Sequence, residues 1–105
     1  MLYIIYCRDD PQSSARLRAQ HIAEHLKYLE ANSNILLLGG ALLAEDGSTR
    51  LGSTLILSVP SREHAVRFSE NEPFRKTGLY TSVEITRMRR GQWHPEKVPK
   101  TVDGD

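Results

Sequence analysis

The feature that most constrains the fold is the order in which short apolar segments alternate with helix-forming ones. The apolar segments are rich in leucine, β-branched or aromatic residues, and turn-forming residues bound them. Helix is favoured by a long run without Gly or Pro and by a short run that begins at Pro60-Ser61. The expected strands are residues 2–7, 35–43, 52–59 and 79–88, and the expected helices are residues 15–31 and a segment from about 61 to 71. This β-α-β-β-α-β order predicts the ferredoxin-like α+β fold, a four-stranded antiparallel sheet with both helices on one face.

The sheet face away from the helices is expected to be too apolar to sit in water. A half-solvated antiparallel sheet alternates apolar and polar residues. The stretch ILLLGGALL at 35–43 does not alternate, and LYIIYC and TLILSV barely do. Its glycines, Gly39 and Gly40, suggest a bend, a bulge or a close approach of another group. We therefore expect a homodimer whose two sheets pack face to face about a two-fold axis.

Length and charge restrict the remaining possibilities. A chain of 105 residues forms one domain, which we assign to residues 1–92, and we expect residues 93–105 to form an extended or flexible tail. Lys and Arg number 14 against 13 Asp and Glu, a balance that favours neither nucleic acid nor an anionic membrane as a partner. The apolar start is too short to span a membrane and has no basic leader. The single cysteine, Cys7, fits a reducing cytoplasm, and we interpret it as a small apolar strand residue rather than a nucleophile.

The stretch HIAEH, residues 21–25, matches the H-x-x-E-H signature of a class of zinc peptidases. On a helix, His21 and His25 would lie one turn apart, as two ligands of one zinc ion do. A catalytic zinc needs a third protein ligand, and enzymes with this signature are far larger. We therefore expect neither a metal nor a cofactor, and a looser metal site shared across a dimer is the alternative.

A helical projection of residues 15–31 separates an apolar stripe from its margin. The stripe expected to face the sheet consists of Ala15, Ile22, Leu26 and Leu29. Arg18 and His25 lie two turns apart just beside it, with His21 further round. An imidazole in that position can reach a pocket while a partner fixes its tautomer. The alternative is a boundary histidine that is hydrogen-bonded to backbone.

A candidate partner follows the second helix, in the stretch Glu70-Asn71-Glu72-Pro73-Phe74. The end of that helix can approach the first helix in this fold, so a glutamate there could accept the histidine N–H. The alternative is a loop with solvated acids that ends the helix. His64 and His94 are expected to be exposed and without function, and Trp93 is expected to dock on the domain or on a dimer partner.

These motifs together resemble the YCII-related family. The resemblance runs from Leu2 to about Gln92 and consists of R-x-x-H-x-x-x-H-L-x-Y-L-E, then L-L-x-G-G-x-L, then E-P-F-x-x-x-G-L. It implies a dimeric α+β barrel, a functional histidine at His25 and a functional carboxylate before a proline. The family has aspartate at that second position, where this chain has Glu72, and the usual A-G-P after the second strand is replaced by Gly39-Gly40-Ala41.

The resemblance also implies a class of chemistry. Some relatives are similar to dehydrochlorinases or muconolactone-type enzymes that act on small cyclic products of aromatic breakdown. For this chain it implies proton transfer by His25, orientation of the imidazole by Glu72, and substrate contacts from Arg18, His21 and Gly40. Two alternatives are an accessory homodimer that binds a small ligand without turnover and a purely structural module.

Overall fold

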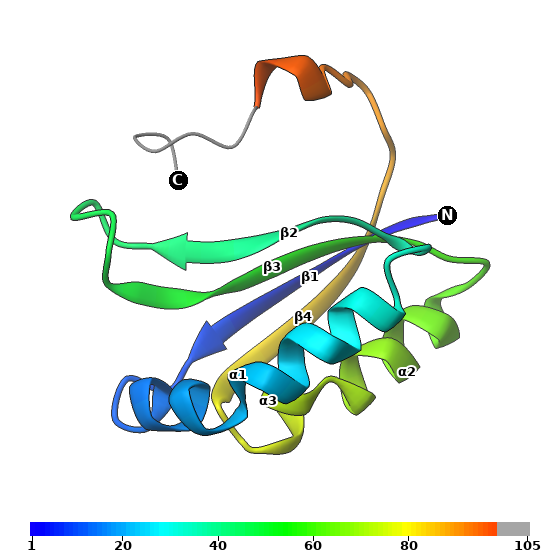
Figure 1. Cartoon of the computed structure of the whole chain (residues 1–105). Coiled ribbons are helices and arrows are strands. Elements are labelled where there is room, and N and C mark those ends of the chain that lie inside the picture. The colour runs from blue at the N-terminus through cyan, green and yellow to red at the C-terminus, as the bar shows by residue number, and fades with distance from the viewer. Residues whose placement is uncertain (99–105) are drawn as a thin grey trace.

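The computed structural model describes residues 1–98, so the expectation for the tail can be compared with the structure only as far as Val98. Four strands form one antiparallel sheet in the order β2-β3-β1-β4. The three α-helices lie together on one face of this sheet (Figure 1). The elements are β1 (Leu2–Asp9), α1 (Ser14–Ala31), β2 (Leu36–Leu43), β3 (Arg50–Ser58), α2 (Arg62–Asn71), α3 (Pro73–Lys76), β4 (Tyr80–Met88) and η1 (Pro95–Lys97). The predicted α+β, ferredoxin-like order is confirmed.

The short helix α3 is the main element that the sequence pattern did not predict. Pro73 has no N–H and cannot continue α2, which ends at Asn71. The same proline has a backbone angle suited to a first helical position, so a new helix starts there. The Glu72 side chain caps this helix, because its oxygens accept from the backbone N–H groups of Phe74 and Arg75.

The core lies between the helices and the sheet. Residues of β1 alternate strictly, with Tyr3, Ile5 and Cys7 buried against the helical layer. The other buried apolar residues are Leu55, Leu57, Val59, Ala65, Phe68, Phe74 and Leu79. Cys7 is therefore a small core residue, as the sequence predicted.

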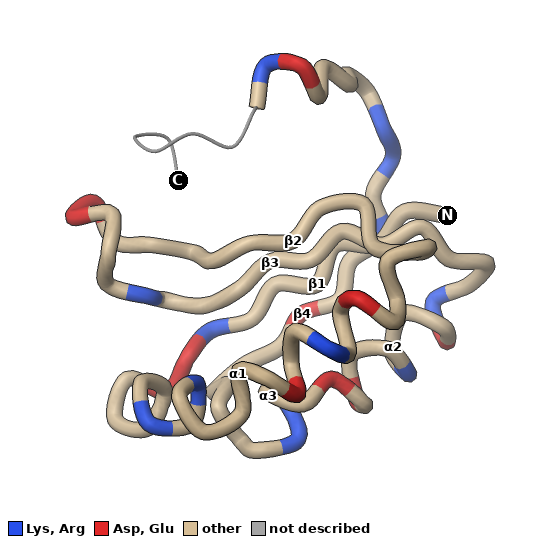
Figure 2. Tube along the Cα trace, in the orientation of Figure 1, with Lys and Arg blue, Asp and Glu red and all other residues tan. Residues whose placement is uncertain are grey.

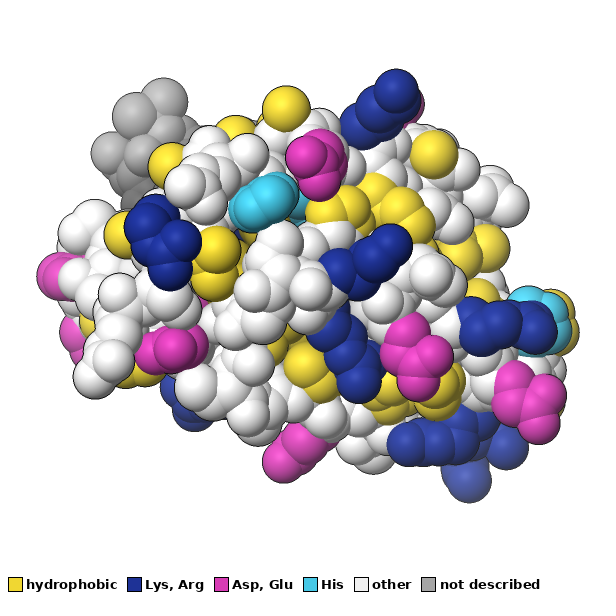
Figure 3. Space-filling view, turned by 90° about the horizontal axis from the view of Figure 1, so that it is seen from below, with side chains coloured by type: hydrophobic (Ala, Val, Ile, Leu, Met, Phe, Trp, Pro, Cys, Tyr) yellow, Lys and Arg dark blue, Asp and Glu magenta, His cyan; other side chains and the backbone are white. Residues whose placement is uncertain are grey.

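Helix α1 packs on a different face from the one that its apolar residues predict. Ile22 is 40% exposed and Leu26 is 56% exposed, whereas Arg18 is only 8% exposed. The inward stripe runs through Arg18, His21, His25, Tyr28 and Leu29, which are buried or half-buried. The predicted inward orientation of Ala15, Ile22 and Leu26 was wrong, because partners for the polar stripe lie beneath it. Apolar side chains consequently reach the surface among the charged ones on the helical side (Figure 3).

The other face of the sheet carries apolar residues with little cover. Leu37, Leu38 and Met88 are exposed, and β2 has no charged residue along its length (Figure 2). The segment after β4 arches over this face, and Trp93 lines a hollow with Leu38 and Ile56.

The two glycines of β2 differ. A Cβ on Gly39 would come within 2.7 Å of the Leu55 side chain, whereas a Cβ on Gly40 would meet no atom within 4 Å. The predicted close approach therefore holds at Gly39. Among residues 1–98, no helix combines the length and apolarity that crossing a membrane requires.

Candidate active site

The central contact of the candidate site joins α1 to the start of α3. His25 Nδ1 lies within hydrogen-bonding distance of Glu72 Oε1, although the two residues are 47 positions apart in sequence. Glu72 is 3% exposed, and its carboxylate also accepts hydrogen bonds from the backbone N–H groups of Phe74 and Arg75, both at 3.2 Å. Its position as the N-cap of α3 fixes the carboxylate at the place where α1 presents the imidazole.

The geometry sets the tautomer of His25. A carboxylate only accepts hydrogen bonds, so Nδ1 is the donor in this contact, and in the neutral ring the lone pair is then on Nε2. Within the described chain, Nε2 has no hydrogen-bond partner and is not among the buried unpartnered atoms, so solvent or a ligand can reach it. The ring stacks on Phe74 with a centroid separation of 4.0 Å and an interplanar angle of 14°. The imidazole is therefore held from two sides and open at the nitrogen that could exchange a proton.

A second polar cluster lies two turns earlier on α1. Arg18 donates from Nε to Asp9 Oδ2 at 3.1 Å and from Nη2 to Asp9 Oδ1 at 2.9 Å. Nη2 also donates to Ser53 Oγ at 3.2 Å, and Tyr80 donates to the same oxygen at 3.4 Å. This bidentate pair neutralises a buried carboxylate and ties α1 to β1 and β3.

The two clusters meet at the Phe74 ring. The Arg18 guanidinium lies 5.0 Å from the ring centroid, and the His25 imidazole stacks on the same ring. Arg18 was expected at the margin of the helix, but it is buried. Asp9 occupies the bidentate face of its guanidinium, which leaves only Nη1 without a protein partner among residues 1–98.

The remaining candidate residues are not brought to the pair in the same way. His21 Nδ1 lies 3.5 Å from Glu24 Oε2 without forming a hydrogen bond, and this nitrogen is buried. Gly40 pairs with Thr54 of β3, and these two residues lie on the sheet face away from the helices. In the described part of the chain, no three His, Cys, Asp or Glu side chains gather as a metal site would require.

Burial and charge suppress ionisation of two groups beneath the site. Burial, with a smaller contribution from the Glu72 charge, raises the pKa of the Cys7 thiol to about 12. Burial is also the main cause that raises the pKa of Tyr80, while its hydrogen bond to Ser53 opposes the rise. Both side chains are therefore neutral near pH 7, so Cys7 is no thiolate nucleophile.

Sequence patterns did not identify Asp9, Ser53 and Tyr80 as parts of the site. The available signal was an acid directly after an apolar strand, in the stretch RDDP, followed nine residues later by an arginine on a helix. Spacing alone does not show that two such residues meet, because the loop between them sets the distance.

Comparison with known proteins identifies the family of the chain. The YCII-related domain model matches residues 1–89. No curated protein matches the chain. Among solved structures, the chain resembles 5-chloro-2-hydroxyhydroquinone dehydrochlorinase (TftG) from Burkholderia phenoliruptrix in complex with 2,5-dihydroxybenzoquinone. The two share 34% sequence identity with a TM-score of 0.77, over 87% of this chain and 96% of the other. The chain therefore belongs to the YCII-related family.

Proposed function

We propose that this protein is a small enzyme that moves protons on a small cyclic substrate derived from an aromatic compound, as a lyase or isomerase. The observation that carries the proposal is the His25–Glu72 contact, with Nδ1 donating to a buried carboxylate and Nε2 left open. His25 is the general base and acid, and Glu72 holds the tautomer and stabilises the imidazolium that forms. The likeness to a dehydrochlorinase supports the same class of chemistry.

For a chlorinated benzenetriol the steps balance without an oxidant. His25 Nε2 takes a proton from one hydroxyl group, whose electrons form a carbonyl, and returns it to the ring carbon that bears chlorine. That carbon then holds both hydrogen and chlorine. A second hydroxyl, para to the first, gives its proton to Nε2, its electrons form the second carbonyl, and chloride leaves with the electrons of the C–Cl bond. The net change is loss of one HCl and formation of a hydroxyquinone.

Arg18 and His21 assist in this proposal from the same helix face. Nη1 of Arg18 offers one N–H to a substrate oxygen, and the other guanidinium donors keep α1 in register on the sheet. His21 lies one turn before His25, so a substrate at Nε2 of His25 would lie near it. Gly40 leaves open space on the sheet face away from the helices and does not contact the His25–Glu72 pair.

The decisive experiment measures chloride release and quinone absorbance from a chlorinated benzenetriol. We expect His25→Ala to lower kcat by about 10²–10⁴-fold, the usual contribution of a general base. His64→Ala is the matched control, because His64 is exposed on α2 and should leave kcat unchanged. Equal activity of wild type and His25→Ala, with both variants folded, would contradict the proposal.

A second copy of the chain covers the open sheet face in this proposal. Leu37 and Leu38 are 49% and 54% exposed there, and Met88 lies at the same face, an apolar surface that favours association. Light scattering should give twice the monomer mass for wild type, and Leu38→Asp should give a monomer. A wild-type protein that stays monomeric at high concentration would overturn the dimer.

Ligand binding without turnover is the second candidate function. The observation in its favour is that Asp9 occupies the bidentate face of Arg18, so the His25–Glu72 pair has no fully free cation beside it. Under this alternative, 2,5-dihydroxybenzoquinone would raise the melting temperature while the benzenetriol would release no chloride.

A further inference from the structure

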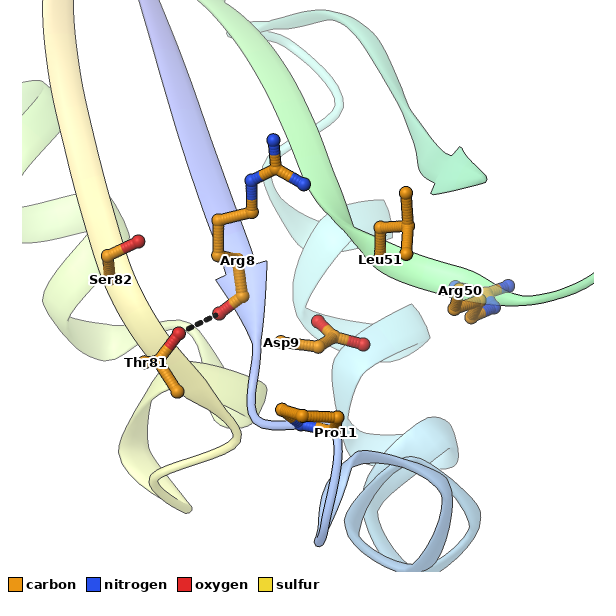
Figure 4. A pocket seen from close by; sticks show the side chains of 7 residues that line it. All are labelled: Arg8, Asp9, Pro11, Arg50, Leu51, Thr81 and Ser82. Carbon is orange, nitrogen blue, oxygen red and sulfur yellow. Dashed lines mark hydrogen bonds between the residues drawn. The ribbon is translucent and has the colours of Figure 1, made fainter. Parts of the chain in front are cut away.

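A hollow of about 340 Å³ lies at the C-terminal end of β1. It is lined by Arg8, Asp9, Pro11, Arg50, Leu51, Thr81 and Ser82, and we name it the β1-end hollow. Figure 4 shows that its walls come from three strands, with Arg8 and Asp9 from β1, Arg50 and Leu51 from β3, and Thr81 and Ser82 from β4. Neither His25 nor Glu72 lines it, and it borders the candidate active site only at Asp9, the partner of Arg18.

The charges around the hollow favour an anion. Arg8 and Arg50 form no ion pair with any carboxylate of residues 1–98. The one acidic wall residue, Asp9, is already neutralised by the bidentate bond to Arg18. Among the lining residues, two guanidinium groups therefore stand against one carboxylate, and that carboxylate is already paired with Arg18.

The hollow also has fixed walls and a free polar donor. Thr81 donates from Oγ1 to the backbone carbonyl of Arg8 at 3.4 Å, which ties β4 to β1 there (Figure 4). The Arg8 guanidinium lies 5.3 Å from the centroid of the Tyr6 ring, so this ring contacts the head group on one side. Ser82 lies opposite Arg8 in the strand register, and its hydroxyl has no hydrogen bond within the described residues.

We infer that the β1-end hollow binds a small oxyanion, the carboxylate or phosphate group of a metabolite. Guanidinium groups recognise the paired oxygens of both kinds of group, and the Ser82 hydroxyl adds a donor. The hollow along α2 differs, because Glu63 stands between its arginines Arg62 and Arg67 and all four lining residues come from one helix. The inference does not require His25 chemistry and would stand if the proposed enzymatic function failed.

The test is a thermal-shift titration of the full chain with inorganic phosphate and, in a second arm, with malonate. Sodium chloride holds the ionic strength constant, so that general screening is the same in every sample. We expect one of the two anions at 10 mM to raise the melting temperature of wild type by about 5 °C, as a millimolar Kd gives in a domain of this size. The arm with the larger shift identifies the kind of oxyanion.

Paired variants decide whether the shift comes from this hollow. Arg8→Gln combined with Arg50→Gln should reduce the shift by at least half, and calorimetry should show a Kd about tenfold weaker or more. Arg16→Gln combined with Arg67→Gln removes the same charge from exposed helix positions and should keep the shift. No shift in wild type, an unchanged shift in the Arg8/Arg50 variant, or an equal loss in both double variants would overturn the inference. His25→Ala should keep the shift, which separates this result from failure of the active-site proposal.

Discussion

A double-mutant cycle on His25 and Glu72 tests whether the two side chains act as a unit. His25→Phe keeps an aromatic ring on Phe74 but removes the Nδ1–H donor, and Glu72→Gln keeps the side-chain length but removes the charge. A hydrogen bond to a buried charged group contributes about 1.5–3 kcal/mol. Both partners are largely buried, with side-chain exposures of 12% and 3%, so solvent screens the contact little. We expect the double variant to lose about 1.5–3 kcal/mol less stability than the sum of the two single variants.

The assay is urea unfolding of the four proteins at one pH, with equal slopes as the check on two-state behaviour. Tyr28→Phe provides the matched control, since the Tyr28 hydroxyl donates to the Phe68 carbonyl at 2.7 Å and also ties α1 to α2. Its coupling to Glu72→Gln should stay below about 0.5 kcal/mol, because the two hydrogen bonds share no atom. Nitrogen NMR of the imidazole should show the proton on Nδ1 in wild type.

Two results would refute this reasoning. A coupling energy as small as that of the Tyr28 control would mean that the carboxylate does not hold the imidazole. A wild-type tautomer with its proton on Nε2 would mean that the open nitrogen carries no lone pair for proton abstraction.

Three further predictions concern the frame around the site. Arg18→Met should lower the free energy of unfolding in urea by about 3–5 kcal/mol, because it leaves Asp9 buried without a partner. Adding Asp9→Leu should recover much of that loss. A loss below about 1 kcal/mol for Arg18→Met would show that the ion pair is unimportant for stability. The Cys7 thiol has its pKa raised from 9.0 to about 12, so the unfolded chain loses this proton first and stability falls as pH rises from about 9 towards 12. By pH 10 the loss is about 1.4 kcal/mol, and it should be absent in Cys7→Ala; parallel pH profiles of the two proteins would contradict the shift. Gly52→Ala should lower the free energy of unfolding by more than about 2 kcal/mol, because its Cβ would come within 1.9 Å of the Cys7 carbonyl oxygen. Gly40→Ala, whose Cβ would meet no atom within 4 Å, should lower it little. Equal melting temperatures of these two variants would refute the comparison.

The sequence predicted the order and type of the main elements because their signals are local. Apolar strand segments, helix-forming runs and breakers such as Pro73 act within a few residues, and the structure follows them to within about two positions. His25 and Glu72 could be singled out because the stretches around them resemble short motifs of the YCII-related family. The dual use of Glu72, as the cap of α3 and as the partner of His25, was not visible, because α3 was not predicted.

The rotation of α1 shows what only the tertiary structure decided. A helical projection places apolar side chains inward, and by that rule Ile22 and Leu26 should be buried and Arg18 should lie at the margin. The folded chain buries Arg18 instead, because Asp9 and Ser53 meet its guanidinium from strands that are 9 and 35 residues away in sequence. A charged side chain is buried when partners satisfy it, and those partners exist only after the sheet has formed. The sequence by itself thus determined the elements and marked His25 and Glu72 as candidates, whereas the tertiary structure decided which face of α1 turns His25 towards Glu72.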